Sequence, residues 1–523
     1  MWYRTHTFCT VLAVLAVVGW SSWHIDSGST FAKSTSPKSL ASPQTKNGLQ
    51  AGQAYAIEFP SAFEQPESAL EITNLPDVYF DLPAGEQNFQ LVLGCVQGEL
   101  VGNSFELEVV SKQESPEGAS SLPFQGRAKF IPLPPLLIPR NTTHNANLFL
   151  TGAARNPGFG SPDRFKFDLT TERILRTFYL YGGEGDFLDQ QSYQQCPTRL
   201  LAESTHLRIW YDTRDESEVT NDDQIQHRHQ QAEHLASVFE QLIVPRLIPW
   251  LGEVSDLDRD GKFSIVLSSQ LNEISKGKEP LVGLTWSGDY RRNLPAPLGN
   301  SSDVVYLNSS SADLKLLTEV LVHEYVHALS FDLHLEASSS PQYSRSEDDW
   351  LNEGLAHVVE TQLTGTQFNI HDRLREFNSR PELYPLVVPN YSRSGLWRSP
   401  GCRGATFSFL RWCIDQRDLQ LVPDLIHAEN AGMPNMVQKM GQPFADLFRG
   451  WSISLSQEST SNLTMQQGDT LHWLQAVTAS RSFLIHQRAE ERLRVRIKNE
   501  SESGMQLTLI PLSDPKAEEA LLN

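Results

Sequence analysis

Basic residues are few in this chain of 523 residues, where 43 Lys and Arg stand against 63 Asp and Glu for a formal net charge of -20. Binding to phosphate groups needs clustered Lys and Arg, which form the electrostatic footprint of proteins that bind nucleic acid or anionic lipid. The charge balance therefore argues against both kinds of partner. The acidic residues are dispersed, as on an ordinary soluble surface, and they indicate no partner of their own.

Cysteine is also scarce: the chain contains 5, and Cys9 lies inside an N-terminal apolar stretch. The other four leave two alternatives open. In an exported protein they could form up to two disulfides, in any of three pairings, and otherwise they are unpaired buried thiols. These four residues are Cys95, Cys196, Cys402 and Cys413.

The N-terminal apolar stretch, residues 8–20, is shorter than a comfortable membrane span. Arg4 precedes it, and this combination is typical of a secretory signal. No clear A-x-A cleavage site follows the stretch. Residues 1–25 are therefore predicted to be a signal peptide or an uncleaved signal anchor. The protein is expected to be secreted or extracytoplasmic, with no membrane contact besides this anchor.

The length favours more than one domain, and no internal repeat with a period of 20–50 residues is present. Short apolar runs between Gly, Asn and Pro predict strands toward both ends of the chain, and helical patterns dominate the middle. The predicted fold class is α+β. Five segments are expected: the signal at 1–25, a flexible spacer at 26–52, a β-rich N-terminal region with a proline-rich linker at 53–144, a central domain at 145–454, and a β-rich C-terminal region at 455–523.

Residues 223–252 predict a long amphipathic helix within the central domain. Six residues are expected to share its apolar side: Ile225, Ala232, Leu235, Val238, Phe239 and Leu242.

The segment HEYVH, residues 323–327, holds two histidines four positions apart and a glutamate beside the first. On a helix, residues four apart lie on one face, so His323 and His327 can direct their imidazoles at one Zn²⁺ ion. Glu324 lies one residue round the helix. It can act on water near the ion as a general base. This spacing is the zinc-hydrolase signature.

An ordinary surface helix is the alternative interpretation of the same letters. The three fixed residues arise by accident in roughly one to a few per cent of chains of this length. The helix is apolar on both sides of the motif, however, and a buried His-Glu-His set without partners is costly. A bound metal removes that cost, so the metal-site interpretation is favoured.

A catalytic zinc site usually needs a third protein ligand. The metzincin pattern would require Gly at 330 and His at 333, but the chain has Ser330 and Leu333, and His334 is one residue out of register. The other candidate is Glu353, in the segment WLNEGLA at residues 350–356. It follows His327 after a gap long enough for a loop and a returning helix.

HEYVH followed by WLNEGLA resembles the gluzincin clan of zinc metallopeptidases, and within it the hyicolysin-type secreted enzymes. Three weaker segments share that resemblance, which extends over about residues 170–430: DLDRDGKFSIVLS at 256–268, DVVYLNSSSADLKLLTEVLVHEYVHAL at 303–329, and GATFSFLRWCIDQ at 404–416. The resemblance implies a zincin-like metallopeptidase domain at 145–454. It also implies that His323, His327 and Glu353 bind zinc and that Glu324 is the general base.

The chain departs from the family pattern at two places. Thermolysin-like enzymes have an Asp four residues after the glutamate ligand, which orients a zinc histidine, and His357 occupies that position here. Either His357 or Glu360 is expected to support the ligands instead. The family also uses a Tyr or His to stabilise the oxyanion. Tyr391 and Arg403 are the two candidates for that role.

Three aspartates, Asp256, Asp258 and Asp260, alternate ahead of Gly261. Such spacing can wrap a Ca²⁺ ion, as at the start of an EF-hand loop. A complete EF-hand is excluded, because its twelfth position would be Leu267 where a glutamate is required. The sequence leaves open a calcium site or an acidic turn without an ion.

The predicted function is a secreted, zinc-dependent peptidase that acts on a protein or peptide substrate. Endopeptidase activity is favoured, because residues 270–322 lack the Gly-x-Met-x-Asn-type stretch with which the aminopeptidase subgroup holds a substrate amine. One alternative is a non-catalytic exported binding protein that retains a zincin-like fold. Another is a zinc hydrolase acting on a non-peptide amide.

Overall fold

The computed structural model describes twelve stretches of the chain. The predicted signal, nearly all of the spacer and most of the proline-rich linker lie outside them. No helix within these stretches is both long and apolar enough to span a membrane. The described residues are 49–59, 77–85, 87–112, 128–134, 175–182, 188–216, 222–274, 281–336, 346–396, 399–458, 463–501 and 503–512.

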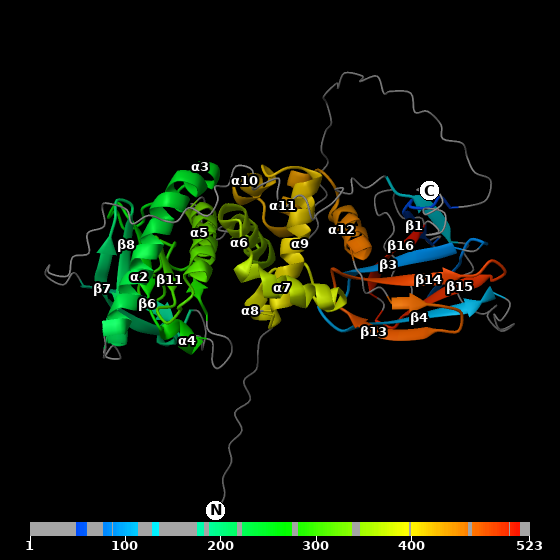
Figure 1. The fold of residues 1–523 in the computed structure, drawn as a ribbon, viewed down its shortest axis with the longest axis horizontal. Helices are drawn as coiled ribbons and strands as arrows, with labels where there is room; N and C mark the ends of the chain where they lie inside the picture. The colour runs from blue at the N-terminus through cyan, green and yellow to red at the C-terminus, as the bar shows by residue number, and fades with distance from the viewer. Residues whose placement is uncertain are drawn as a thin grey trace, which may run out of the picture. The chain divides into compact units, whose positions relative to one another are not determined.

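Strands from the two ends of the chain form two sheets that share one core (Figure 1). The six-stranded sheet has the order β12-β14-β3-β16-β1-β5, and the four-stranded sheet has the order β13-β4-β15-β2. Alternate residues of β15 are buried, as expected for a strand with one face on a core. The strands are β1 (Tyr55–Glu58), β2 (Asp77–Asp81), β3 (Gln87–Gln97), β4 (Asn103–Ser111), β5 (Lys129–Pro132), β12 (Leu463–Met465), β13 (Thr470–Gln475), β14 (Ala479–Gln487), β15 (Leu493–Asn499) and β16 (Gly504–Pro511).

This arrangement changes the predicted segmentation. The regions 53–144 and 455–523 were expected as two separate β-rich flanks, yet β3 pairs with β14 and β16, and β4 pairs with β13 and β15. Each region alone would leave open strand edges and half of a hydrophobic core. The two regions therefore complete one another. Pattern in the sequence identifies strands, but it does not say which distant strand is the partner.

A third sheet, with the order β10-β11-β9-β8-β7-β6, lies in the central part of the chain. Strands β8, β9 and β11 run parallel, and β10 is antiparallel to β11 at one edge. Ile265 and Leu267 belong to the large core on one face, whereas Val266 belongs to a smaller core on the other face. The strands are β6 (Leu175–Tyr181), β7 (Tyr193–Glu203), β8 (Leu207–Asp212), β9 (Phe263–Leu267), β10 (Gly283–Leu284) and β11 (Val304–Leu307).

Helices α2 (Asp222–Val238) and α5 (Leu314–Glu336) pack on the face of this sheet that contributes to the large core (Figure 1). The chain of α2 continues through a π-helical segment, η5 (Phe239–Leu247), into α3 (Ile248–Leu251). The predicted apolar side of this helix is buried at five of its six positions, but Ile225 is 45% exposed. Helix α4 (Gln270–Ile274) follows β9, and short 3₁₀ turns, η3 (Gln190–Ser192) and η4 (Thr213–Glu216), flank β7 and β8.

The remaining helices follow α5 and extend the large core. Gly354 permits close approach of α6 to α9, because a Cβ there would lie 2.4 Å from the Thr406 side chain. Helix α12 continues past the predicted boundary at residue 454 and contacts the six-stranded sheet, where Gln90 donates a hydrogen bond to the Ser456 carbonyl at 2.7 Å. These elements are α6 (Asp349–Thr364), α7 (Phe368–Ser379), η6 (Pro381–Leu383), α8 (Tyr391–Ser394), α9 (Pro400–Gln416), α10 (Leu421–Ile426), α11 (Gly432–Met440) and α12 (Phe444–Glu458).

The mixture of helices and sheets confirms the α+β class. Of the two alternatives for the cysteines, the structure has the second: Cys95, Cys196, Cys402 and Cys413 are all buried free thiols. Burial raises the pKa of Cys95 to about 12 and that of Cys402 to about 11, so both remain protonated near neutral pH.

Candidate metal centre

Helix α5 presents His323 and His327 on one face, as their spacing predicts. The helix is buried over residues 319–330, and the two histidines are only 4% and 9% exposed. Their Nε2 atoms lie 3.0 Å apart. Two imidazoles held this close in an apolar helix need a shared proton, a carboxylate or an ion to satisfy their nitrogens.

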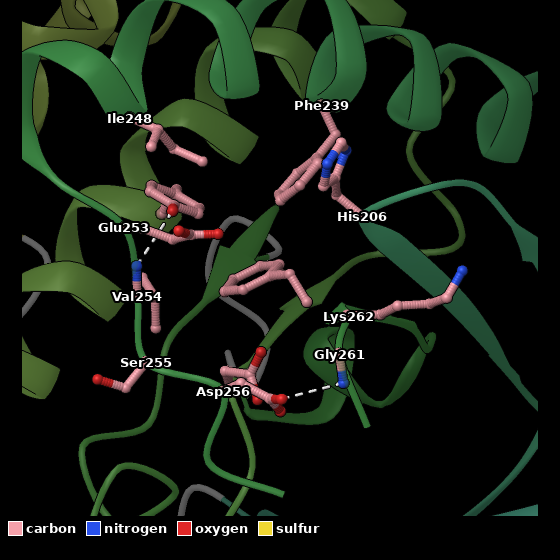
Figure 2. Close-up of a pocket in the computed structure, with 12 residues that line it drawn as sticks. His206, Phe239, Ile248, Glu253, Val254, Ser255, Asp256, Gly261 and Lys262 are labelled. Carbon is pink, nitrogen blue, oxygen red and sulfur yellow. Dashed lines mark hydrogen bonds between the residues drawn. The ribbon is translucent and has the colours of Figure 1, made fainter. Parts of the chain in front are cut away.

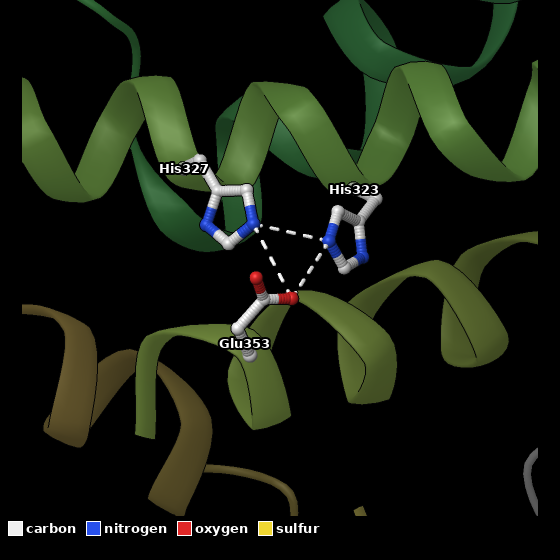
Figure 3. Close-up of side chains that lie close together, drawn as sticks. All are labelled: His323, His327 and Glu353. Carbon is white, nitrogen blue, oxygen red and sulfur yellow. Dashed lines mark hydrogen bonds and ion pairs between the residues drawn. The ribbon is translucent and has the colours of Figure 1, made fainter. Parts of the chain in front are cut away.

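Helix α6 supplies the third predicted residue. Figure 3 shows Glu353 pointing from α6 toward the two imidazoles on α5. Its Oε2 atom lies 3.3 Å from Nε2 of His323 and 3.8 Å from Nε2 of His327. The sequence placed Glu353 here from the gap and the resemblance alone, and the structure brings the three residues together.

The geometry of these three atoms fits a bound metal ion. Two ligand atoms bound tetrahedrally at roughly 2.0–2.1 Å from one zinc lie about 3.3 Å apart. The three observed separations are 3.0, 3.3 and 3.8 Å. The Oε2 atom of Glu353 is buried without a hydrogen-bond partner among the described residues. His323, His327 and Glu353 could therefore hold a metal ion.

The outer support of His323 comes from Glu360, one of the two residues expected for this role, which lies three positions beyond His357 on α6. Glu360 is fully buried, and its Oε2 lies 3.0 Å from Nδ1 of His323. Its Oε1 lies 2.8 Å from Nδ1 of His357, and Asn369 donates a hydrogen bond to Oε2 at 2.8 Å. With Nδ1–H of His323 donated to Glu360, the lone pair of Nε2 is directed at the metal position.

His357 itself is fully buried and lies beside His323 rather than beside the metal position. Burial, opposed by the charge of Glu360 but reinforced by that of His323, lowers the pKa of His357 well below its usual value. It is therefore a neutral donor to Glu360. A second group of potential ligands, His323, His357 and Glu360, also converges, but its atoms are already engaged in these hydrogen bonds.

We expect Glu360→Gln to weaken metal binding about tenfold to a hundredfold and to destabilise the fold by about 2 kcal/mol. The amide group of the variant would place an N–H group against the N–H donors of His323, His357 and Asn369, which now share the carboxylate. Zinc titration and thermal unfolding measure the two effects. The matched control is Asp372→Asn, which makes the same chemical change at a side chain that is 73% exposed and should change stability by less than about 0.5 kcal/mol. Equal behaviour of the two variants would contradict this role of Glu360.

Arg403 forms an ion pair with Glu353, the third candidate metal ligand. Its Nη2 donates to Oε1 of Glu353 at 2.6 Å, and both side chains are largely buried. Although burial raises the pKa of Glu353, the charges of Arg403 and the histidines outweigh it and hold that pKa far below its usual value. Glu353 is therefore an anion. The contact makes Arg403 a positioning residue for Glu353, and a direct role on an oxyanion stays a prediction.

Tyr391, the other predicted oxyanion stabiliser, begins helix α8 and is 3% exposed. Its hydroxyl has no hydrogen-bond partner among the described residues. Burial, together with the negative charge of Glu353, raises the pKa of Tyr391, so the hydroxyl keeps its proton. The role of Tyr391 at the site stays a prediction.

Glu324 is buried on α5, and its carboxylate is held by Thr285, which follows strand β10. Thr285 donates a hydrogen bond to Oε2 of Glu324 at 2.7 Å, and its hydroxyl also lies 3.0 Å from the Glu324 carbonyl. Gly283 leaves room for this carboxylate, since a Cβ there would lie 2.6 Å from Oε1 of Glu324. Burial raises the pKa of Glu324 to about 7, against the opposing effects of His323 and Thr285. A carboxylate of that pKa suits a general base near neutral pH.

The aspartate-rich loop brings Asp256, Asp258 and Asp260 together. Arginines already neutralise two of them: Arg176 lies 2.7 Å from Asp258, and Arg208 pairs with Asp260. The carboxylate of Asp256 accepts hydrogen bonds from the backbone N–H groups of residues 260 and 261. Because a calcium ion would have to compete with both guanidinium groups, this arrangement favours a structural acidic turn over the predicted calcium site.

No protein-family model and no curated protein matches this chain. The case for the metal centre therefore depends on the residues and their geometry. Sequence reasoning did not find Thr285, Gly283 or Asn369, which lie in a loop, an edge strand and a helix start outside the two motifs. No spacing in the sequence relates these positions to the histidines, because folding alone brings them there.

Proposed function

We propose that this protein is a zinc-dependent metallopeptidase of the gluzincin type, with a zincin-like domain formed by the central sheet and the helices from α2 to α12. The convergence of one carboxylate and two imidazoles around a single position, beside a second buried carboxylate, carries the proposal. The set of two histidines and one glutamate is typical of catalytic zinc sites that keep an open coordination position.

Zinc bound at this position would supply Lewis-acid activation of water and of the scissile carbonyl. The residues of the chain provide the rest. Glu324 takes a proton from the attacking water and passes it to the leaving amine. Thr285 holds the carboxylate in place for that transfer, and Glu360 and Arg403 fix the orientation of the ligand side chains.

A protein or peptide substrate is supported by the edge strand beside Glu324. Strand β10 is the last strand of its sheet among the described residues, and Gly283 on it lies against the Glu324 side chain. An extended peptide can add to such an edge through backbone hydrogen bonds, which would place a peptide bond near the carboxylate. This supports endopeptidase cleavage, in an exported protein, of an extended segment within a longer chain.

Metal removal tests the proposal. Treatment of the purified protein with 1,10-phenanthroline is expected to lower cleavage of casein at least about tenfold, and added Zn²⁺ should restore it. The non-chelating isomer 1,7-phenanthroline is the control and should have no effect. Metal analysis should find about one equivalent of zinc per chain before treatment. Cleavage that persists after the metal has been removed would contradict the proposal.

The pairing of Arg403 with Glu353 favours a second candidate function, an exported binding protein that retains the site without turnover. In this case the guanidinium group competes for the carboxylate and leaves it a weaker ligand. Zinc bound at one equivalent, with no cleavage of casein or of peptide libraries, would support this alternative. Cleavage of a non-peptide amide in a substrate profile would instead identify a hydrolase of another substrate class.

A further inference from the structure

Glu319 is fully buried and lies one helical turn before His323 on α5. The two side chains share a face of the helix, since they are four residues apart. The carboxylate of Glu319 accepts a hydrogen bond from the Thr366 hydroxyl, one from the backbone N–H of Phe368 at 3.1 Å and one from that of Asn369 at 2.6 Å. A buried carboxylate is costly unless its oxygens are bonded in this way. These contacts tie α5 to the start of α7.

The start of α7 depends on this carboxylate. The first N–H groups of a helix have no partner within the helix, and a Ser, Thr, Asp or Asn at the N-cap position usually supplies one. The N-cap residue here is Gln367, and within this described segment its side chain makes no capping hydrogen bond. Glu319 takes that role from another helix and places a negative charge at the positive end of the helix dipole. It thereby fixes the first turn of α7, in which Asn369 is the second residue.

Asn369 connects this first turn to the support of the metal centre. Its side-chain N–H donates to Oε2 of Glu360 at 2.8 Å, and the same oxygen lies 3.0 Å from Nδ1 of His323. The side-chain oxygen of Asn369 accepts a hydrogen bond from Arg373 at 2.9 Å, which keeps the N–H side of the amide turned toward Glu360. The hydrogen bonds thus lead from Glu319 through α7 and α6 to His323, one turn further along α5.

This circuit of hydrogen bonds also positions the second helix that carries a metal ligand. Glu353 and Glu360 are seven residues apart on α6, so they lie on the same face, two turns from one another. Fixing Glu360 against α5 and α7 therefore helps to set the 3.3 Å and 3.8 Å separations of Glu353 from the two histidines. A metal site requires its ligand distances to within about 0.2 Å, so a small displacement of α6 would weaken it.

The opposite side of α5 is held by different contacts. Tyr325 lies two residues from each histidine and projects from that side. Its hydroxyl accepts a hydrogen bond from the backbone N–H of Val254 at 3.3 Å (Figure 2), and its ring lies 5.1 Å from that of Phe263, the first residue of β9. The central sheet therefore anchors α5 on this side, and the circuit that begins at Glu319 anchors it on the side of the metal ligands.

We propose that Glu319 is a positioning residue of the metal centre, which acts through Asn369 and Glu360 to hold α5 and α6 at the separation that metal binding requires. The inference rests on the metal site of the proposed function but not on peptide cleavage. A capping role alone would stabilise α7 without changing the affinity of the ligands for zinc. The two roles therefore differ in the metal binding of protein that remains folded.

Glu319→Gln should weaken zinc binding about fivefold or more. In either orientation, the NH₂ group of the Gln side chain faces at least one backbone N–H group that the carboxylate now accepts, so the start of α7 must shift. Competition titration with a chromogenic chelator measures the affinity. The visible absorption bands of the Co²⁺-loaded protein report the ligand geometry and should change as well.

The matched control is Tyr325→Phe, which removes a buried hydrogen bond from the opposite side of the same helix. It should lower the melting temperature and leave the zinc affinity and the cobalt spectrum unchanged. Glu319→Asp keeps the charge on a shorter side chain and is the second variant should Glu319→Gln not fold. It should weaken zinc binding at least about twofold.

A double-mutant cycle tests the route through Asn369. Asn369→Ala should itself weaken zinc binding, and Glu319→Gln added to it should cause less than about a twofold further loss. Multiplicative effects in this cycle, or wild-type zinc affinity and cobalt spectrum in the folded Glu319 variant, would overturn the inference. If the wild-type chain binds zinc and cleaves casein, those results leave the proposed function standing. A wild-type chain that bound no zinc would overturn both.

Discussion

The variant Glu324→Gln is expected to retain zinc and to lose nearly all proteolytic activity. Glu324 is not one of the three converging ligand candidates, so its replacement leaves the ligand atoms in place. The amide oxygen of Gln can still accept the hydrogen bond that Thr285 now donates to Oε2. An amide cannot take a proton from water, so the step that depends on a base is lost.

The expected loss in kcat is about a thousandfold, within the range for removal of a general base. It corresponds to about 4 kcal/mol in the activation free energy. KM should change by less than about threefold, because Glu324 acts on water rather than on bound substrate. Steady-state kinetics on a fluorogenic peptide, with metal analysis of the same samples, measure both quantities.

The matched control for this experiment is Glu273→Gln, which makes the same chemical change at an exposed glutamate of α4. It should have wild-type kinetics. If Glu324→Gln cleaved peptides at the wild-type rate with its zinc bound, Glu324 would not be the base. A loss of activity accompanied by loss of zinc would show instead that the substitution disturbs the ligands.

The second large effect is expected for Glu353→Gln, which should lower metal affinity about a hundredfold or more. The substitution removes the negative charge that faces both Nε2 atoms, and an amide is a weaker ligand than a carboxylate. It also leaves the Arg403 guanidinium without its anionic partner in a largely buried position. Competition titration with a chromogenic zinc chelator measures the affinity.

Arg403→Met separates the two roles considered for Arg403. A positioning residue that holds Glu353 should, when removed, change zinc affinity with only a proportional change in activity. If Arg403 instead stabilises the transition state, its removal should lower kcat by about a hundredfold or more with full zinc occupancy.

The double variant Glu353→Gln/Arg403→Met should be more stable than Glu353→Gln alone, because it contains no unpaired buried charge. Wild-type zinc affinity in Glu353→Gln would remove Glu353 from the ligand set.

Two expectations from the sequence depend on environment rather than on pattern. Ile225 lies on the apolar stripe of its helix, yet it is near the helix start, beyond the part that packs on the sheet. The aspartates 256, 258 and 260 have the spacing of calcium ligands, but Arg176 and Arg208 come from β6 and β8 to pair with two of them. Arg176 and Arg208 are distant from these aspartates in the sequence, so no local sequence pattern predicts the two ion pairs.

The sequence by itself determined what depends on neighbours along the chain. A helical period puts His323 and His327 on one face, the apolar surround buries them, and the WLNEGLA helix offers Glu353 within reach. Only the tertiary structure decided which distant groups complete these elements: Glu360 and Asn369 behind His323, Arg403 on Glu353, Thr285 on Glu324, and C-terminal strands that pair with N-terminal ones. The physical reason is that helix and strand periodicities are local, whereas hydrogen bonds and ion pairs between separate elements depend on packing that the whole core sets.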